Sequence, residues 1–136
     1  MIVGDLSQPE LTECLAGDGL ALRLGPFNLR IRSDLPSIAL LAHRFYHPYP
    51  VPEVDAIADF HVEISAPRGV RRWLRRQACF GVDGQFPFAP YAVDHAFPAL
   101  EWGINWCVAT RAHHLLLLHS AVVERNGRAI VFPASP

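Results

Sequence analysis

The most regular feature of the sequence is an alternation of apolar and polar residues, which is typical of strands that place one face in a core. It occurs in residues 20–24, 29–31 and 60–64. The first two segments are separated by Gly25-Pro26, so they are predicted to form a hairpin. The polar face of this hairpin carries three arginines, Arg23, Arg30 and Arg32.

A second hairpin is predicted from a turn signal. Asp83-Gly84 separates two short apolar segments, residues 79–82 and 85–88. Asp-Gly favours the positive φ angles of a tight two-residue turn, so the two segments are expected to pair as antiparallel strands. The segment before them, residues 68–76, is compatible with either a helix or an extended chain.

Apolar residues at helical spacing predict two main helices and one short one. The short helix spans about residues 9–15 and ends at the glycines that follow it. The first main helix follows Ser33 and Asp34, either of which can cap it, and has Pro36 in its first turn. Its apolar stripe is expected to comprise Leu35, Ile38, Leu41, Ala42 and Phe45.

The second main helix is the longest and spans about residues 93–114. Gly103 lies in its middle, where glycine costs about 1 kcal/mol relative to alanine, so we expect a close packing contact there. The residues expected to face the core are Ala99, Trp102, Trp106 and Ala109 or Thr110, with Leu100, Gly103 and Cys107 beside them. These elements predict an α+β fold in which antiparallel hairpins form a mixed sheet packed by two main α-helices.

The composition is that of a globular protein. The 136 residues are 51% apolar, with a mean hydropathy of +0.16, which is enough for one domain to bury a core. The net charge of −1 provides no general attraction to nucleic acid or to an anionic membrane, so neither is expected as a partner. No apolar run approaches the roughly 20 residues of a membrane span, and the N-terminus lacks the pattern of a signal peptide.

The cysteines and histidines do not form a metal-binding pattern. The odd number of widely spaced cysteines favours free thiols and a cytoplasmic location. The three are Cys14, Cys79 and Cys107. Two histidine pairs, His43/His47 and His113/His114, lack an acidic or thiol ligand that would complete a site. We therefore expect no metal site in this chain.

A cluster of arginines lies within residues 68–76. On a helix, these arginines would fall on the side opposite the apolar residues. Guanidinium groups match anionic oxygens, so the cluster predicts a surface for an acidic protein or ligand, with a solvated face as the alternative. The candidate partner-binding residues are Arg68, Arg71, Arg72, Arg75 and Arg76.

The last part of the sequence has the pattern of a third hairpin. Residues 115–124 predict a strand, Asn126-Gly127 a type I′ turn, and residues 128–132 the antiparallel partner. A strand that runs into Pro-Ala-Ser-Pro is compatible with the start of a phosphate-binding loop. From the residues alone, an edge hairpin that closes a sheet is the favoured interpretation.

Residues 115–136, LLLLHSAVVERNGRAIVFPASP, resemble the segment just upstream of the P-loop in the HPr serine kinase/phosphorylase family. The resemblance is closer to the HPr kinase-related proteins of the HprK-related kinase A group, in which a similar run leads to Pro-Ala and then to Gly-Ser-Gly-Lys-Ser/Thr. Residues 100–113, LEWGINWCVATRAH, also resemble the helix before this strand in the same group. The resemblance is specific from about Asp94 to Pro136 and weaker over the preceding residues.

The resemblance implies roles for four residues. His119 corresponds to a histidine that is assigned to the active site of these kinases, with a structural histidine at a strand end as the alternative. Ala134, Ser135 and Pro136 occupy the first three positions of the P-loop pattern, with alanine in place of its first glycine. The P-loop lysine, the magnesium-binding Ser/Thr and the acidic base have no counterpart, so this chain itself is expected to hold no cofactor.

The resemblance therefore implies the N-terminal part of an ATP- and Mg²⁺-dependent protein serine kinase, cut just before its P-loop. Residues 1–112 would form an N-terminal α+β region, and residues 113–136 the first strands of the P-loop kinase core. This part is expected to be non-catalytic and to serve as a scaffold, in homo-oligomer formation, or in recognition of a small HPr-like carrier protein. Two alternatives remain open: a stand-alone protein-binding module that uses Arg68–Arg76, and a remnant gene product without activity.

Overall fold

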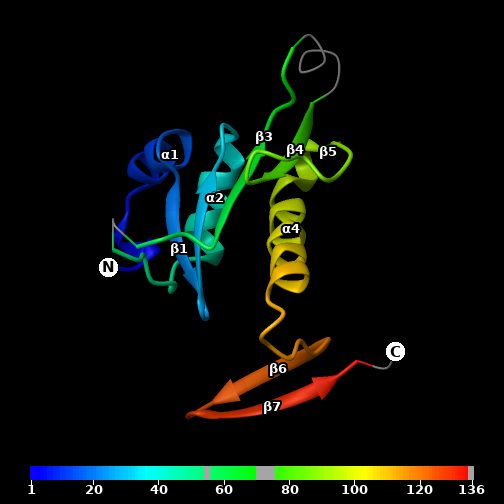
Figure 1. The fold of residues 1–136 in the computed structure, drawn as a ribbon. Coiled ribbons are helices and arrows are strands. Elements are labelled where there is room, and N and C mark those ends of the chain that lie inside the picture. The colour runs from blue at the N-terminus through cyan, green and yellow to red at the C-terminus, as the bar shows by residue number, and fades with distance from the viewer. Residues whose placement is uncertain (54–55, 70–75, 135–136) are drawn as a thin grey trace.

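A computed structural model describes residues 1–53, 56–69 and 76–134 (Figure 1). Within these ranges the chain forms a five-stranded mixed sheet with helices packed against it, and a separate two-stranded sheet. The α+β class predicted from the sequence is therefore confirmed. The predicted partner residues Arg71, Arg72 and Arg75 lie outside the described residues, as do the P-loop positions Ser135 and Pro136.

The large sheet has the strand order β1-β2-β3-β4-β5. Strand β2 runs parallel to β3, and the other neighbouring pairs are antiparallel. The parallel pair arises because α2 connects the two strands, as in other β-α-β units. The strands are β1 (Leu20–Leu24), β2 (Phe27–Arg32), β3 (Phe60–Ser65), β4 (Gln77–Val82) and β5 (Tyr91–Ala92).

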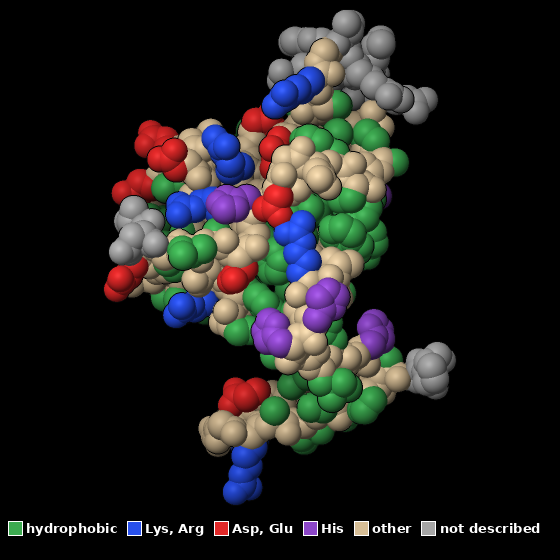
Figure 2. Space-filling model, viewed as in Figure 1, with side chains coloured by type: hydrophobic (Ala, Val, Ile, Leu, Met, Phe, Trp, Pro, Cys, Tyr) green, Lys and Arg blue, Asp and Glu red, His purple; other side chains and the backbone are tan. Residues whose placement is uncertain are grey.

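The helices cover the apolar face of this sheet and leave the other face to solvent. They comprise the α-helices α1 (Gln8–Ala16), α2 (Pro36–Phe45) and α4 (Ala96–Arg111) and the 3-10 turns η1 (Val3–Asp5) and η2 (Val93–His95). Alternate residues of the strands are buried, for example Phe60, Val62 and Ile64 of β3. Their neighbours in sequence form the open polar face, which includes the arginines predicted for it. Charged side chains gather on this face in Figure 2.

The start of α2 differs from the prediction that Ser33 or Asp34 caps it. The N-cap is Leu35, which makes no capping hydrogen bond through its side chain. The Ser33 hydroxyl instead donates to the carbonyl of Ile64 at 2.6 Å, and the Asp34 carboxylate accepts from the N–H of Ala66 at 2.9 Å. Both side chains therefore tie the end of β2 to the end of β3.

The apolar stripe of α2 is also shorter than predicted. Its buried residues are Ile38, Ala39 and Ala42, whereas Phe45 is 53% exposed. Phe45 stacks on Phe97 of α4, with ring centroids 5.4 Å apart. The end of α2 lies at the edge of the helical layer, so its last aromatic ring is covered on one side only.

The predicted core face of helix α4 is confirmed in part. Ala99, Leu100, Gly103 and Cys107 are buried as expected, whereas Trp102 is 51% exposed. The expected close contact at Gly103 is confirmed, because a Cβ there would lie 2.2 Å from the buried ring of Phe80. Because Gly103 has no Cβ, α4 can approach β4 closely at this point.

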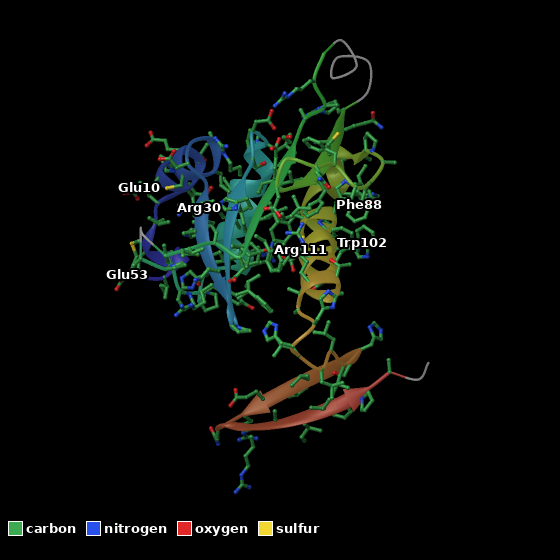
Figure 3. The ribbon with its side chains drawn as sticks, viewed as in Figure 1. Glu10, Arg30, Glu53, Phe88, Trp102 and Arg111 are labelled. Atoms are coloured by element: carbon green, nitrogen blue, oxygen red, sulfur yellow. The ribbon has the colours of Figure 1, made fainter. Side chains whose placement is uncertain are left out.

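The predicted strand at residues 85–88 is wrong. Gln85 forms one isolated bridge with Val82, and the partner of β4 on this side is β5, which pairs with Gln77 and Ala78. Prolines interrupt the ladder here, because they lack the N–H that a strand needs. Phe88 turns inward instead, with its ring centroid 4.5 Å from that of Trp102 (Figure 3).

The two-stranded sheet consists of β6 (Ser120–Arg125) and β7 (Arg128–Pro133). The predicted turn is confirmed, since Asn126 and Gly127 have φ angles of 54° and 75°. The first strand is shorter than predicted. Residues 115–118 belong to the exposed connection after α4, so the prediction of a strand there is wrong.

Candidate functional site

The open end of the β6–β7 hairpin brings together two residues that the sequence analysis singled out. The N–H of Ala134 donates a hydrogen bond to the carbonyl of His119, with an N–O distance of 2.9 Å. His119 directly precedes β6 and Ala134 directly follows β7, so strand pairing places them opposite each other. The side chain of His119 is exposed. This end of the hairpin is therefore accessible to a ligand.

Both faces of the same hairpin are apolar and open. The cross-strand pairs Val123–Ile130 and Val122–Val131 lie on opposite faces. The large apolar side chains of the two strands are between 45% and 61% exposed. They are Val122, Val123, Ile130, Val131 and Phe132. Figure 2 shows hydrophobic side chains spread over the hairpin, and Figure 1 shows it apart from the large sheet below α4.

The described residues of the hairpin do not provide a nucleotide site. Phosphoryl-transfer sites of the P-loop type need a lysine, a Ser/Thr ligand for Mg²⁺ and a loop that leads into a helix. The whole sequence contains no lysine, because all 12 of its Lys and Arg residues are arginines. ATP and Mg²⁺ therefore do not fit the residues present.

The structure describes two of the five arginines predicted to bind a partner, Arg68 and Arg76, and they line different clefts. Arg68 lines a cleft of about 360 Å³ at the ends of β2 and β3. Arg76 lines a different cleft of about 420 Å³, beside Gln77 and the start of α2. Both side chains are exposed at these clefts, so each is available to a ligand.

The cleft at Arg68 contains further charged residues that the sequence analysis did not assign to a binding site. Arg32, Asp34 and Glu63 line it together with Arg68, so it holds charges of both signs. Their proximity depends on the parallel pairing of β2 and β3, whose last residues become neighbours. The sequence did contain a signal for this cleft. Polar residues occur at the ends of two strands, and such residues meet at one edge of the sheet when the strands are parallel.

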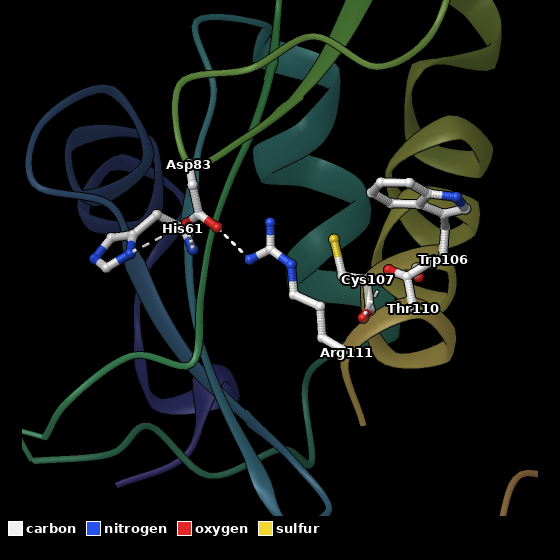
Figure 4. A network of polar contacts seen from close by, with 6 residues as sticks. All are labelled: His61, Asp83, Trp106, Cys107, Thr110 and Arg111. Carbon is white, nitrogen blue, oxygen red and sulfur yellow. Dashed lines mark hydrogen bonds and ion pairs between the residues drawn. The ribbon is translucent and has the colours of Figure 1, made fainter. Parts of the chain in front are cut away.

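A polar network joins α4 to the open face of the sheet (Figure 4). Arg111 forms an ion pair with Asp83, and the N–H of His61 donates to the same carboxylate at 3.2 Å. Partial burial alone would raise the pKa of Asp83, but the hydrogen bonds from Arg111 and His61 outweigh it and lower that pKa. The guanidinium of Arg111 also lies 5.7 Å from the ring centroid of Phe60. These contacts anchor the end of α4.

Two buried groups near α4 are chemically inert. Burial raises the pKa of the Cys107 thiol, despite the opposing charge of Arg111, so the thiol stays protonated. Burial, followed by the hydrogen bond to Glu101, raises the pKa of Tyr46. The Tyr46 hydroxyl donates to Glu101 and thereby links α2 to α4. Both groups belong to the hydrophobic core between the helices and the sheet.

No group of three or more His, Cys, Asp or Glu side chains among the described residues is arranged to hold a metal ion. None of the described helices is both long enough and apolar enough to cross a membrane.

Comparisons with protein families, with curated proteins and with solved structures each found no match for this chain.

Proposed function

We propose that this chain is the N-terminal region of an HPr kinase-related, ATP-dependent protein serine kinase of the cytoplasm. The observation that carries the proposal is the pairing of His119 with Ala134 at the open end of the β6–β7 hairpin. The resemblance assigns these two residues to the same active site. The hydrogen bond between them supports that assignment, because residues of one site must lie close together.

The exposed faces of the hairpin support the same proposal. Strands that are apolar on both faces are characteristic of α/β cores, in which helices or other layers cover each side of the sheet. The pairs Val123–Ile130 and Val122–Val131 would be central positions of such a core. In this proposal, residues 113–136 begin the kinase core, and the remainder of that core covers both faces.

The chain itself is non-catalytic in this proposal. It lacks the lysine that neutralises the phosphates and the groups that hold Mg²⁺, on which most of the catalysis of phosphoryl transfer depends. Residues 1–112 would serve as a scaffold, in homo-oligomer formation, or in recognition of a small HPr-like carrier protein whose serine is the acceptor. ATP and Mg²⁺ would bind to the full kinase.

The coding sequence after Pro136 tests the proposal most directly. We expect Gly-x-Gly-Lys-Ser/Thr within a few codons, in register with Ala134. Absence of this motif would show that the proposal is wrong. Calorimetry with the isolated chain provides a second test, in which we expect ATP affinity no tighter than about 1 mM. Micromolar binding by the isolated chain would contradict the non-catalytic role.

The role of His119 can be tested in the protein extended through that motif. His119→Ala should lower the rate of phosphorylation of the carrier protein by about 100-fold or more, as expected for loss of an acid–base group. His114→Ala is the matched control, because His114 is exposed in the nearby connection but does not border Ala134. Equal activity of the two variants would remove His119 from the active site.

A second candidate function is a protein-binding module that uses Arg68–Arg76. It is supported by the positions of Arg68 and Arg76, both of which are exposed at clefts. The Arg68→Glu/Arg76→Glu variant should weaken binding of an acidic peptide by about tenfold or more. Arg125→Glu, in the hairpin, should leave it unchanged. Equal binding by both variants would exclude this function.

A further inference from the structure

The cleft at the carboxyl ends of β2 and β3 has an unusual arrangement of charges. Arg32 and Glu63 are register neighbours across these parallel strands, and both belong to the open face of the sheet. Opposite charges at such positions would be expected to pair. Within the described residues, however, Arg32 and Glu63 form no ion pair with each other.

Each of the two side chains is held by a different neighbour. The Arg32 Nε donates to the carbonyl of Gly17 at 3.0 Å. The Glu63 carboxylate accepts from the Ser65 hydroxyl at 2.6 Å. The stem of Arg32 also lies over Gly19, where an added Cβ would be 3.0 Å from the Arg32 Cγ. The guanidinium and the carboxylate are therefore bound to different neighbours, and both residues line the cleft.

Hydrogen bonds also fix the backbone that lines the cleft. Ser33 Oγ donates to the carbonyl of Ile64, which fixes the end of β2 against β3. Asp34 accepts from the N–H of Ala66 on the other side of the cleft. A site whose walls are fixed before the ligand arrives loses less conformational entropy on binding. At about 360 Å³, the cleft also has the size of a small-molecule site.

We propose that this cleft binds a free α-amino acid with an apolar side chain. The carboxylate of the ligand would be bound by Arg32, with Arg68 at the rim, and its ammonium group by Glu63, with Asp34 nearby. A simple anion would meet the two carboxylates, and a simple cation would meet the two guanidinium groups. A zwitterion satisfies both sets of charges.

The spacing of the strands favours an α-amino acid over a longer zwitterion. Neighbouring strands lie about 4.8 Å apart, so the backbone positions that carry Arg32 and Glu63 are close together. In an α-amino acid, both charged groups are attached to one carbon atom and can reach the two sides simultaneously. A ligand with widely separated charges would leave one of them outside the cleft.

An adjoining cleft accounts for the apolar side chain of the ligand. It has a volume of about 260 Å³, shares Glu63, Ser65 and Arg68 with the first cleft, and is lined in addition by Phe86. The ring of Phe86 lies over Gly81 and is 51% exposed. An apolar side chain placed there would cover this ring and gain contact with an aromatic surface.

Calorimetry with leucine and two of its analogues tests the proposed chemistry. 4-Methylpentanoate lacks the ammonium group, and 3-methylbutylamine lacks the carboxylate. We expect leucine to bind and each analogue to bind at least about tenfold more weakly, because one side of the cleft is left without a partner. Equal binding of leucine and either analogue would overturn the proposal, as would absence of binding for leucine and phenylalanine at about 10 mM.

Variants of the two central residues locate the binding site. Arg32→Gln and Glu63→Gln should each weaken leucine binding by about tenfold or more. Arg30→Gln is the matched control, since Arg30 lies two residues earlier on the same strand and face but does not line the cleft, and it should change binding by less than about twofold. Circular dichroism confirms that each variant is folded. Unchanged binding by Arg32→Gln or Glu63→Gln would overturn the proposal.

The outcome of this test does not depend on the proposed kinase function. The cleft belongs to residues 1–112, whereas the kinase proposal depends on His119 and Ala134. Failure of leucine binding would therefore leave the test of the downstream coding sequence unaffected. Binding of leucine would assign a ligand to residues 1–112 whether or not the kinase proposal is correct.

Discussion

The large sheet and the β6–β7 hairpin are built from similar apolar strands but have opposite environments. In β3, Phe60, Val62 and Ile64 are buried beneath the helices. In the hairpin, apolar residues of comparable size remain more than half exposed on both faces, for example Ile130 on one face and Val122 on the other. The difference arises from the second layer. Helices α1, α2 and α4 cover one face of the large sheet, whereas no described element covers both faces of the hairpin.

This comparison shows that an apolar pattern specifies a strand but does not bury it. A sheet is stabilised when another layer covers its apolar face, and an isolated two-stranded hairpin is marginally stable in water. Residues 1–112 contain both layers of their own core. The hairpin contains only one layer, so its stability depends on what packs against it.

The largest expected effect is a contrast between two isoleucines. Ile64→Ala should lower the free energy of unfolding by about 2–5 kcal/mol, because Ile64 is 0% exposed and its loss leaves a cavity. Ile130→Ala should change it by no more than about 0.5 kcal/mol, because Ile130 is 61% exposed. Urea unfolding of both variants measures the contrast. Similar losses would show that the hairpin is already covered in solution.

The next effect tests the close approach of α4 to the sheet. Gly103→Ala should lower the free energy of unfolding by about 2 kcal/mol, since the clash with Phe80 outweighs the gain in helix propensity. Asn105→Ala, at an exposed position of the same helix, is the control and should have little effect. A stabilised Gly103→Ala protein would contradict the packing of α4 against β4.

A smaller effect is expected at the ion pair between Asp83 and Arg111. Asp83→Asn keeps a residue that tolerates the positive φ of 49° but removes the charge. The pair is partly exposed and screened, so the loss should be below about 1 kcal/mol at pH 7.

The same substitution has an expected pH dependence. Since the pKa of Asp83 is lowered in the folded chain, its contribution is present above the unfolded pKa and is lost as the pH falls through the folded pKa. Thermal unfolding of the wild type and Asp83→Asn should therefore differ at pH 7, and the difference should shrink as the pH falls below the ordinary Asp pKa of about 3.9. A difference that persists in acid would assign the effect to the turn instead of the charge.

The smallest effect is expected from removal of the hairpin. A chain that ends at Ala112, which is buried, should unfold with a free energy within about 1 kcal/mol of that of the full chain. Differential scanning calorimetry measures this directly. A large loss would show that the hairpin packs against residues 1–112, and would remove the contrast between the two regions.

Local patterns were sufficient to predict most of the elements. Alternation predicted β1, β2 and β3, and helical spacing predicted α1, α2 and α4. Asn126-Gly127 predicted the terminal turn because its φ angles depend on those two residues alone. The errors occurred where a distant contact determines the structure. Phe88 packs against Trp102 instead of continuing a hairpin, and Asp34 bonds to Ala66 instead of capping α2.

The two candidate sites were predicted to different extents, because one depends on local strand pairing and the other on a long-range contact. His119 and Ala134 were singled out from the sequence by resemblance, and their proximity follows from hairpin register, which is a local property. The cleft of Arg32 and Glu63 was not predicted. These residues are 31 positions apart, and only the parallel pairing of β2 with β3 makes them neighbours.

The sequence by itself determined most of the strands and helices, the Asn126-Gly127 turn and an apolar hairpin, because these depend on residues within a few positions of one another. Only the tertiary structure decided which apolar residues are buried and which charges share a cleft. Burial requires a second layer from elsewhere in the chain, and Arg32 and Glu63 are brought together while their side chains form hydrogen bonds with Gly17 and Ser65. Both outcomes depend on long-range packing, which local periodicity does not encode.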